Sequence, residues 1–346
     1  MTNQSLSTAS TAPVLVEVWR GAAVESRHRG AVVAATATGR IIAAVGDPHW
    51  LCFLRSAAKP FQAITVLRTG AGERFRLTTQ EVALIAASHN GEPEHTAVVA
   101  GLLERLGLTA EALRCGVHPP FNSAAARRLA GVAVTPLHNN CSGKHAGMLA
   151  GCLAAGFSTD DYDNPAHPLQ AMMAQVVAEM CGVPVEQMPV GLDGCTVPTW
   201  AVPLAAMAVG YARLFTHSPY PAESHHVTTA MLAHPELVGG TERIDTDLMR
   251  AVPGRLLSKV GAEGVHVVAV PPSDRFPEGL GVAVKIEDGD SFRARNTAML
   301  AALQRLGLLG AASHDALAVK YSRPVLTHRN QVAGGVRAVF SLDLLV

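Results

Sequence analysis

Residues 53–62 read FLRSAAKPFQ, and this stretch marks the place where the chain changes its type of secondary structure. Before it, PVLVEVWRG (residues 13–21) alternates apolar and polar side chains, and GAVVAATATGRIIAAVGD (residues 30–47) is typical of a hairpin that turns at its central TG pair. After it, KPFQAITVLRTG (residues 59–70) is apolar at helical spacing and ends in a glycine. The stretch therefore predicts a passage from a sheet into a helical region.

The helical pattern continues to about residue 235, and strands return after residue 262. Thr78 and Glu81 form a capping box at the start of one helix. SGKHAGMLAGCLAAG (residues 142–156) predicts a helix of very small residues that its neighbours approach closely. Two strand-like segments, a helix and a last strand-like segment close the chain: GVHVVAV (264–270), GLGVAVKIED (279–288), SFRARNTAMLAALQRLG (291–307) and GGVRAVFSLDLL (334–345).

The order of these segments predicts the fold class. Strands, then helices, then strands with a helix indicate an α/β (α+β) fold, in which one mixed sheet is built from both termini and a helical lobe is inserted between them. We expect a disordered tail over residues 1–11 and a single domain of two lobes over residues 12–346. The sheet lobe is expected to comprise about residues 12–55 and 260–346, and the helical lobe about residues 56–259.

Composition and charge narrow the class of protein. With 49% hydrophobic and 16% charged residues the chain can bury a large core, and its 28 basic and 28 acidic residues cancel. The absence of a basic run argues against nucleic acid or an anionic membrane as a partner. The chain begins without a signal-peptide pattern and has no run of about 18 apolar residues, so we expect a cytoplasmic protein. Its six cysteines lack a disulfide-scaffold pattern and are expected to be reduced.

Ser56 and Lys59 are the first candidates for chemistry, because residues three apart in a helix lie on one face. A serine hydroxyl is a poor nucleophile unless a base takes its proton, and a buried lysine that has lost its own proton can be that base. The alternative is a small serine in a packed helix start beside a solvated lysine. The S-x-x-K spacing alone is therefore weak support for a nucleophile and its base.

Two further short motifs strengthen this interpretation. Ser88 begins the only S-x-N sequence in the chain, and Lys259 begins the only K-x-G sequence. Together with S-x-x-K they occur in the order found in the penicillin-recognising serine acyl enzymes, where the three motifs line one cleft. A turn serine and a surface lysine are the alternatives for these two positions.

Longer stretches resemble the Rhizobium-type L-asparaginases, and the resemblance covers nearly the whole chain from about residue 12 onward. Motifs of eight to fourteen letters are far more specific than triplets. The stretches are RSAAKPFQA (55–63), SHNGEPEH (88–95), HNNCSGKHAGML (138–149), GLDGCTVPTWAVPL (191–204) and PGRLLSKVGAEGV (253–265).

The resemblance implies a fold like that of the serine β-lactamases and penicillin-binding proteins, and the hydrolysis of asparagine to aspartate and ammonia. It also implies two serine–lysine pairs, Ser56 with Lys59 and Ser88 with Lys259. A homodimer is the assembly that the family implies.

The same resemblance implies a zinc site made by two cysteines and a lysine, which falls on Cys141, Lys144 and Cys195. Lysine is a rare zinc ligand because it must first lose a proton, and spacing alone favours His138, Cys141 and His145. Free buried cysteines that pack as small apolar side chains are a further alternative. If zinc binds, we expect the chemistry itself to proceed without it.

Arg55, Asn90 and Asp193 are the predicted substrate-binding residues. Arg55 precedes the candidate nucleophile and can hold a substrate carboxylate through two hydrogen bonds, with a structural salt bridge as the alternative. Asp193, close to the predicted zinc ligand Cys195, can bind a substrate ammonium or orient a ligand.

The resulting hypothesis is an L-asparaginase that forms an acyl-enzyme on Ser56. A β-lactamase-like enzyme or another serine amidohydrolase, such as a glutaminase, is one alternative, and the missing export signal argues against a β-lactamase. A non-catalytic zinc-binding sensor on the same fold is the other. The presence of both serines and both lysines argues against an inert cleft.

Overall fold

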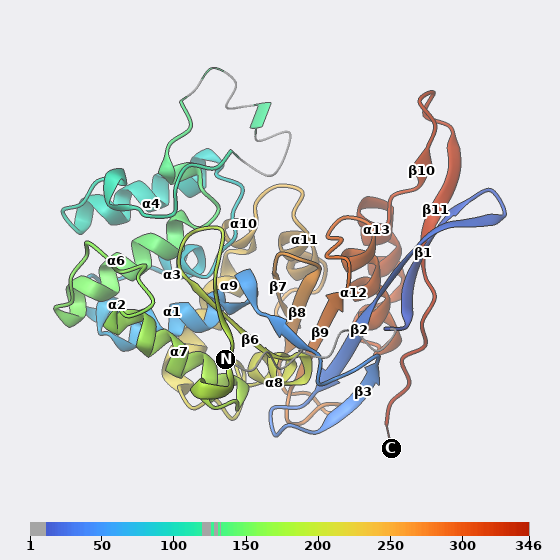
Figure 1. The fold of residues 1–346 in the computed structure, drawn as a ribbon, viewed down its shortest axis with the longest axis horizontal. Helices are drawn as coiled ribbons and strands as arrows, with labels where there is room; N and C mark the ends of the chain where they lie inside the picture. Colours follow the sequence, from blue (N-terminus) through green and yellow to red (C-terminus); the bar gives the residue numbers. More distant parts are fainter. Residues whose placement is uncertain (1–11, 120–125, 128–130, 132, 346) are drawn as a thin grey trace, which may run out of the picture.

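The computed structural model describes residues 12–119, 126–127, 131 and 133–345, and the tail expected over residues 1–11 lies outside them. Two lobes lie side by side, one mainly helical and the other built on a large sheet (Figure 1). The sheet lobe contains the first and the last described segments, and most of the intervening chain forms the helical lobe.

Eight strands of the described residues form the large sheet. They are β1 (Val14–Arg20), β2 (Ala23–Ala35), β3 (Ile41–Val45), β7 (Leu257–Val260), β8 (Val265–Val270), β9 (Leu280–Ile286), β10 (Val325–Leu326) and β11 (Val332–Ala338). Their order is β10-β11-β1-β2-β9-β8-β7, with β3 paired to β2. This arrangement confirms the predicted α/β fold class, with a sheet from both termini and a helical lobe between.

Every described pair of neighbouring strands is antiparallel, which corrects the expectation of a mixed sheet. The short turn between β2 and β3 is enough for an antiparallel pair, whereas parallel neighbours need a crossover connection. β1 pairs with β11 and β2 with β9, so strands from the two ends of the chain interleave and close the sheet lobe.

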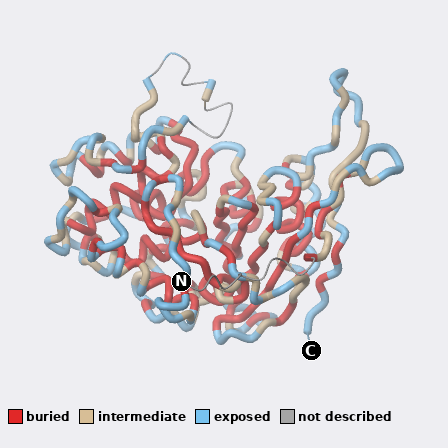
Figure 2. Tube along the Cα trace, viewed as in Figure 1, coloured by how far each residue is buried: buried red, intermediate tan, exposed pale blue. Residues whose placement is uncertain are grey.

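The centre of the large sheet is covered on both faces, because every residue of β8 and nearly every residue of β9 is buried (Figure 2). Helices α8 (Leu204–Ala212) and α12 (Ala294–Arg305) both pack on β9, and α13 (Ala311–Tyr321) packs on α12. A side-chain carbon at Gly281 would lie 1.8 Å from the carbonyl oxygen of Ala208. The close approach of α8 to the sheet therefore requires glycine there.

The helical lobe surrounds α6 (Ser142–Ala155), the predicted helix of small residues. A side-chain carbon at Gly143 would lie 2.4 Å from the carbonyl oxygen of Leu84, so α3 packs directly on the backbone of α6. The capping box of Thr78 and Glu81 starts α3 as predicted. The other helices of the described chain before β7 are α1 (Lys59–Arg68), α2 (Ala71–Arg74), α3 (Thr79–Ile85), α4 (Pro93–Arg105), α7 (Pro168–Cys181), α9 (Pro221–Ala233), α10 (Pro235–Val238) and α11 (Ile244–Ala251).

A second, three-stranded sheet connects the lobes, and the sequence pattern did not predict it. Its strands are β4 (Leu51–Phe53), β6 (Pro198–Pro203) and β5 (Val190–Leu192), in that order. Two of them have only three residues, and proline stands at both ends of β6, so neither length nor alternation marks them as strands. The segment predicted as helical thus contains two strands.

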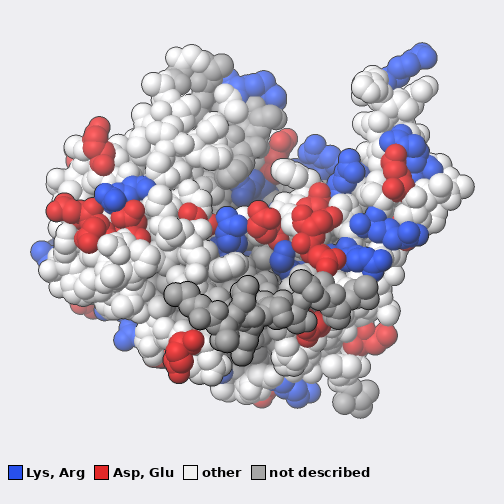
Figure 3. Space-filling model, in the orientation of Figure 1, with Lys and Arg blue, Asp and Glu red and all other residues white. Residues whose placement is uncertain are grey.

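The surface carries charges of both signs without a stripe of one sign on the face that Figure 3 shows. Among the described residues, no helix is both long and apolar enough to cross a membrane.

Candidate active site

Ser56 lies on the turn that leads from the small sheet into the helical lobe. The 3-10 turn Arg55–Ala58 continues directly into α1, whose first residue is Lys59. Arg55 has a φ of 49°, a left-handed conformation that is uncommon for residues other than glycine and is found more often at functional sites. Ser56 is half-buried, and its hydroxyl has no hydrogen-bond partner among the described residues, whereas Lys59 is fully buried.

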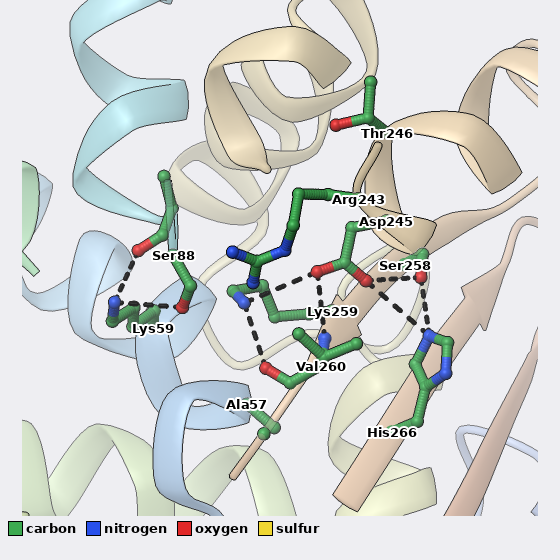
Figure 4. A network of polar contacts seen from close by, with 12 residues as sticks. Ala57, Lys59, Ser88, Arg243, Asp245, Thr246, Ser258, Lys259, Val260 and His266 are labelled. Carbon is green, nitrogen blue, oxygen red and sulfur yellow. Dashed lines mark hydrogen bonds and ion pairs between the residues drawn. The ribbon is translucent and has the colours of Figure 1, made fainter. Parts of the chain in front are cut away.

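The Nζ of Lys59 has three oxygen partners. It donates to the carbonyl of Ala87 at 2.6 Å and to the carbonyl of Asn140 at 3.1 Å. It also donates to Ser88 Oγ at 3.0 Å (Figure 4). A neutral amine has two N–H groups and one lone pair, so with two carbonyls as acceptors the lone pair would face the hydroxyl. Once neutral, Lys59 is therefore placed to accept a proton from a serine.

Ser88 follows α3, and its own N–H donates to the carbonyl of Val238 at 3.0 Å. The sequence pairs Ser88 with Lys259, but in the structure its hydroxyl bonds to Lys59, 29 residues away in the chain. The pairing with Lys259 therefore stays a prediction.

Asn90, two residues after this serine, is fully buried. Its Nδ2 donates to the carbonyl of Thr241 at 2.8 Å, and its Oδ1 accepts from Arg243 at 3.0 Å. The amide thus joins the serine turn to the segment that enters α11. A contact of Asn90 with substrate stays a prediction.

Lys259 lies on β7 and is fully buried. Its Nζ donates to the carbonyl of Val260 at 3.0 Å and lies 3.6 Å from Oδ2 of Asp245. Burial lowers the pKa of Lys259 to about 7, against the opposing attraction of Asp245, and the positive charges of Lys59 and Arg243 lower it further. A lysine with this pKa can give or take a proton near neutral pH.

Arg55 and Asp193 form an ion pair, with Nε 2.7 Å from Oδ1. Burial would raise the pKa of Asp193, but Lys144 and Arg55 together hold it below its ordinary value. A terminal nitrogen of Arg55 lies 4.0 Å from the exposed carboxylate of Glu263. The structural salt bridge considered for Arg55 is thus present, and the guanidinium still has other N–H groups for a ligand.

The three predicted zinc ligands come together although Lys144 and Cys195 are 51 residues apart. Lys144 Nζ donates to Cys195 Sγ at 2.8 Å, and all three side chains are buried. The hydrogen bond from Cys195 lowers the pKa of Cys141, so the negative charge of the pair resides on the sulfur of Cys141. Burial would lower the pKa of Lys144, but the two sulfurs and Asp193 raise it.

Two converging sulfurs suit zinc, and Lys144 would complete the donor set only after it lost the proton that it donates to Cys195. Within the described residues, no group of three or more His, Cys, Asp or Glu side chains is arranged to hold a metal, so a zinc site here depends on Lys144. Of the alternative ligands, His138 accepts the N–H of Thr135 at Nδ1. His145 Nδ1 lies 2.8 Å from the hydroxyl of Tyr162, while its Nε2 has no hydrogen-bond partner among the described residues.

Asp245, Ser258 and His266 form a buried polar group behind Lys259, and the sequence reasoning missed all three. The available signals were weak. Ser258 precedes Lys259 directly, and Asp245 is the second residue of a short helix whose remaining pattern resembles a surface helix. Neither spacing nor composition shows that α11 turns this carboxylate inward.

One serine hydroxyl, that of Ser88, contacts a buried lysine, and a serine beside a lysine that can lose its proton is an arrangement suited to nucleophilic chemistry. A family model described as L-asparaginase II matches residues 16–338, nearly the whole chain. The chain therefore belongs to the L-asparaginase II family, and this membership indicates an enzyme that hydrolyses amides.

Solved structures give only a distant likeness. A structure of Mglu in its native form matches with 15% identity and a TM-score of 0.44 over 82% of this chain, which spans 66% of that one, just under two thirds. A probable glutaminase from Bacillus subtilis complexed with 6-diazo-5-oxo-L-norleucine matches with 14% identity and a TM-score of 0.39 over 84% of each chain. No curated protein matches. At these TM-scores the neighbours carry no argument about the site.

Proposed function

We propose that this chain is an L-asparaginase that hydrolyses L-asparagine to L-aspartate and ammonia through an acyl-enzyme on Ser56. The observation that carries the proposal is the contact between Lys59 Nζ and Ser88 Oγ. Lys59 lies one helical turn after Ser56, and the chain belongs to the L-asparaginase II family. Ser56 is the half-buried serine and Ser88 the buried one, which supports the first as nucleophile and the second as its relay.

The reaction proceeds in two half-reactions. Ser56 Oγ bonds to the side-chain amide carbon of asparagine while its hydroxyl proton passes by way of Ser88 to neutral Lys59, and the backbone N–H of Ser56 stabilises the oxyanion. The C–N bond then breaks, and ammonia leaves with a returned proton. Water hydrolyses the aspartyl ester in the second half-reaction, with Ser88 and Lys259 handling its proton.

Charged residues beside Ser56 select the substrate. Arg55 binds the α-carboxylate through its terminal N–H groups, and Asp193, already paired with Arg55, faces the α-ammonium. Asn90, whose Oδ1 accepts a hydrogen bond from Arg243, is the third substrate-binding residue of the proposal. A linear amino acid amide with both charged groups fits this arrangement better than a β-lactam.

Cys141, Lys144 and Cys195 hold a zinc ion in this proposal. Bound zinc supplies a fixed positive charge beside Asp193 that supports substrate binding, while the serines and lysines carry the reaction. Cytoplasmic location and assembly as a homodimer complete the proposal, and the homodimer is what the resemblance to the asparaginase family implies.

Ammonia release by the purified enzyme tests the proposal. Asparagine is expected to be hydrolysed faster than glutamine at equal concentration, and nitrocefin to remain intact. Preferred hydrolysis of glutamine would make the enzyme a glutaminase, and nitrocefin turnover would favour the β-lactamase alternative.

A further inference from the structure

Lys259, the lysine of the second predicted pair, faces a buried carboxylate that the proposed chemistry does not yet use. Asp245 lies in the first turn of α11, and its Oδ2 is 3.6 Å from Lys259 Nζ (Figure 4). The same Oδ2 accepts the N–H of Val260 at 3.1 Å, while Lys259 Nζ donates to the carbonyl of Val260 at 3.0 Å. Carboxylate and amine are thus both tied to the backbone of one residue.

The far oxygen of the carboxylate is held by hydrogen bonds whose proton directions follow from the groups involved. Ser258 Oγ donates to Asp245 Oδ1 at 2.7 Å, because an ionised carboxylate only accepts. A hydroxyl has one proton, so the 2.8 Å contact between Ser258 Oγ and His266 Nε2 requires the histidine N–H to donate. His266 Nδ1 is then unprotonated, and it has no hydrogen-bond partner among the described residues.

Asp245 and His266 keep the same charge across neutral pH. Burial would raise the pKa of Asp245, but Lys259, His266 and the hydrogen bonds from Ser258 and Val260 lower it to about 2. Burial lowers the pKa of His266 to about 3. The carboxylate is therefore an anion and the imidazole neutral, so Lys259 is the member of this group that titrates near pH 7.

We propose that Asp245 is the positioning residue of Lys259, and that Ser258 and His266 in turn hold Asp245. This inference rests on the proposed function, in which Lys259 handles a proton. Asp245 lies behind the lysine and acts through it. Without the carboxylate, the amine would lose its ion pair and keep the hydrogen bond to the carbonyl of Val260, the other contact shown for it among the described residues.

The charge of Asp245 also sets the pH at which Lys259 titrates. The charged and titratable groups that act on the amine come from separate elements: Asp245 and Arg243 at α11, Lys59 at α1, Cys141 before α6 and His266 on β8. Asp245 and a Cys141 thiolate raise the pKa of Lys259, and the two cations lower it. An opposite charge at this range typically shifts a pKa by about 1 to 3 units. Asp245→Asn is therefore expected to move the Lys259 transition to lower pH by that amount.

The test compares the pH dependence of kcat for asparagine hydrolysis in the wild type and in Asp245→Asn. We expect kcat to fall at least about tenfold. The limb of the pH profile of kcat that lies near pH 7 should move to lower pH, whether Lys259 acts as acid or as base. The matched control is Asp247→Asn. Asp247 lies on the same helix, and its carboxylate is bonded to Lys320 and Tyr321. Its removal should leave both kcat and the pH profile of kcat unchanged.

Lys259→Met separates this inference from the proposed function. If that variant is inactive while Asp245→Asn keeps the wild-type limb and a rate within twofold, the positioning role is wrong and the serine–lysine chemistry stands. If Lys259→Met is fully active, both the second pair and the role of Asp245 are wrong.

A second pair of variants applies if Asp245→Asn does not fold. His266→Leu removes the N–H that supports Ser258, whereas His266→Gln retains a donor near the position of Nε2. We expect the leucine variant to lose kcat with KM unchanged, and the glutamine variant to recover most of it. Equal kcat and equal pH profiles in both variants and the wild type would overturn the proposal.

Discussion

The half-buried hydroxyl of Ser56 makes no hydrogen bond to the described residues, so its removal leaves the fold intact. Ser56→Ala is expected to keep the unfolding temperature and to lower ammonia release from asparagine at least about 1,000-fold, because the covalent route has no substitute. Ser26→Ala, a half-buried serine on β2, is the matched control and should keep full activity. A folded Ser56→Ala enzyme with a tenth of the wild-type rate would show that another residue is the nucleophile.

Lys59 combines a chemical role with a structural one, because its Nζ is the donor to two carbonyls. Lys59→Met keeps the shape of the side chain but removes the base, so turnover should be lost almost completely. The carbonyls of Ala87 and Asn140 lose this donor, and each buried group left unpaired costs about 1–3 kcal/mol of unfolding free energy. Urea denaturation and turnover, measured on one preparation, check both expectations.

Lys320→Met is the control for that variant, because Lys320 bonds to Asp247 on the rim of the sheet lobe. It should retain turnover. Wild-type activity in Lys59→Met would contradict the assignment of Lys59 as base.

At the scale of single residues, the sequence shows directly which candidates lie close together along the chain. Ser56 and Lys59 are three apart on one turn, which the sequence shows directly. The bond from Lys59 to Ser88 joins residues 29 apart, and its existence depends on how α3 packs beside α1. The sequence therefore shows which candidates are neighbours on one turn, but not which distant serine contacts which lysine.

At the scale of elements, the packing of α3 on α6 connects stability with the site, because Ser88 follows the end of α3 and Asn140 precedes α6. Gly143→Ala would place a carbon 2.4 Å from the carbonyl oxygen of Leu84, so the helices must separate. We expect a loss of about 1–3 kcal/mol in unfolding free energy, together with lower kcat because Lys59 and Ser88 shift apart. Thermal unfolding and ammonia release measure the two effects.

Gly101→Ala provides the control, since a side-chain carbon there would meet no atom within 4 Å. Gly101 lies inside α4, where alanine is favoured over glycine by roughly 0.5–1 kcal/mol. This variant should therefore be slightly more stable with unchanged activity. A Gly143→Ala protein as stable as Gly101→Ala would show that α3 and α6 can adjust without cost.

The long helices and strands were predictable because their periodicity is local, as in α6, α12 and β8. The small sheet was not predictable, because β4 and β5 are too short to show an alternation of apolar and polar residues. This sheet nevertheless places Asp193 beside Arg55, so the missed element is one that builds the site.

At the scale of the whole molecule, the candidate site lies where the two lobes meet, with Lys59 and Ser88 on one side and Lys259 on the other (Figure 4). Hydrophobic periodicity gives the order of elements and hence the architecture. It contains no information on the contacts between lobes, which explains why Asp245 escaped notice while the fold class did not.

The cluster of Cys141, Lys144 and Cys195 ties α6 to the loop after β5, and zinc bound there is expected to stabilise the whole chain. A ligand that binds only the folded state raises the unfolding temperature. We therefore expect about one zinc per chain and a lower unfolding temperature after chelation. Elemental analysis and calorimetry measure these without reference to activity. Cys152→Ala, a buried cysteine outside the cluster, should retain the metal.

Replacing both cysteines decides what the metal does. Cys141→Ser with Cys195→Ser should contain no zinc, have a raised KM for asparagine and keep measurable kcat, because Ser56 and Lys59 supply nucleophile and base. The loss of affinity follows from Asp193, which lies within 3.8 Å of Cys195 Sγ and is paired with Arg55. If the folded double variant has no turnover at saturating asparagine, zinc takes part in the chemistry and the serine mechanism is wrong in its main step.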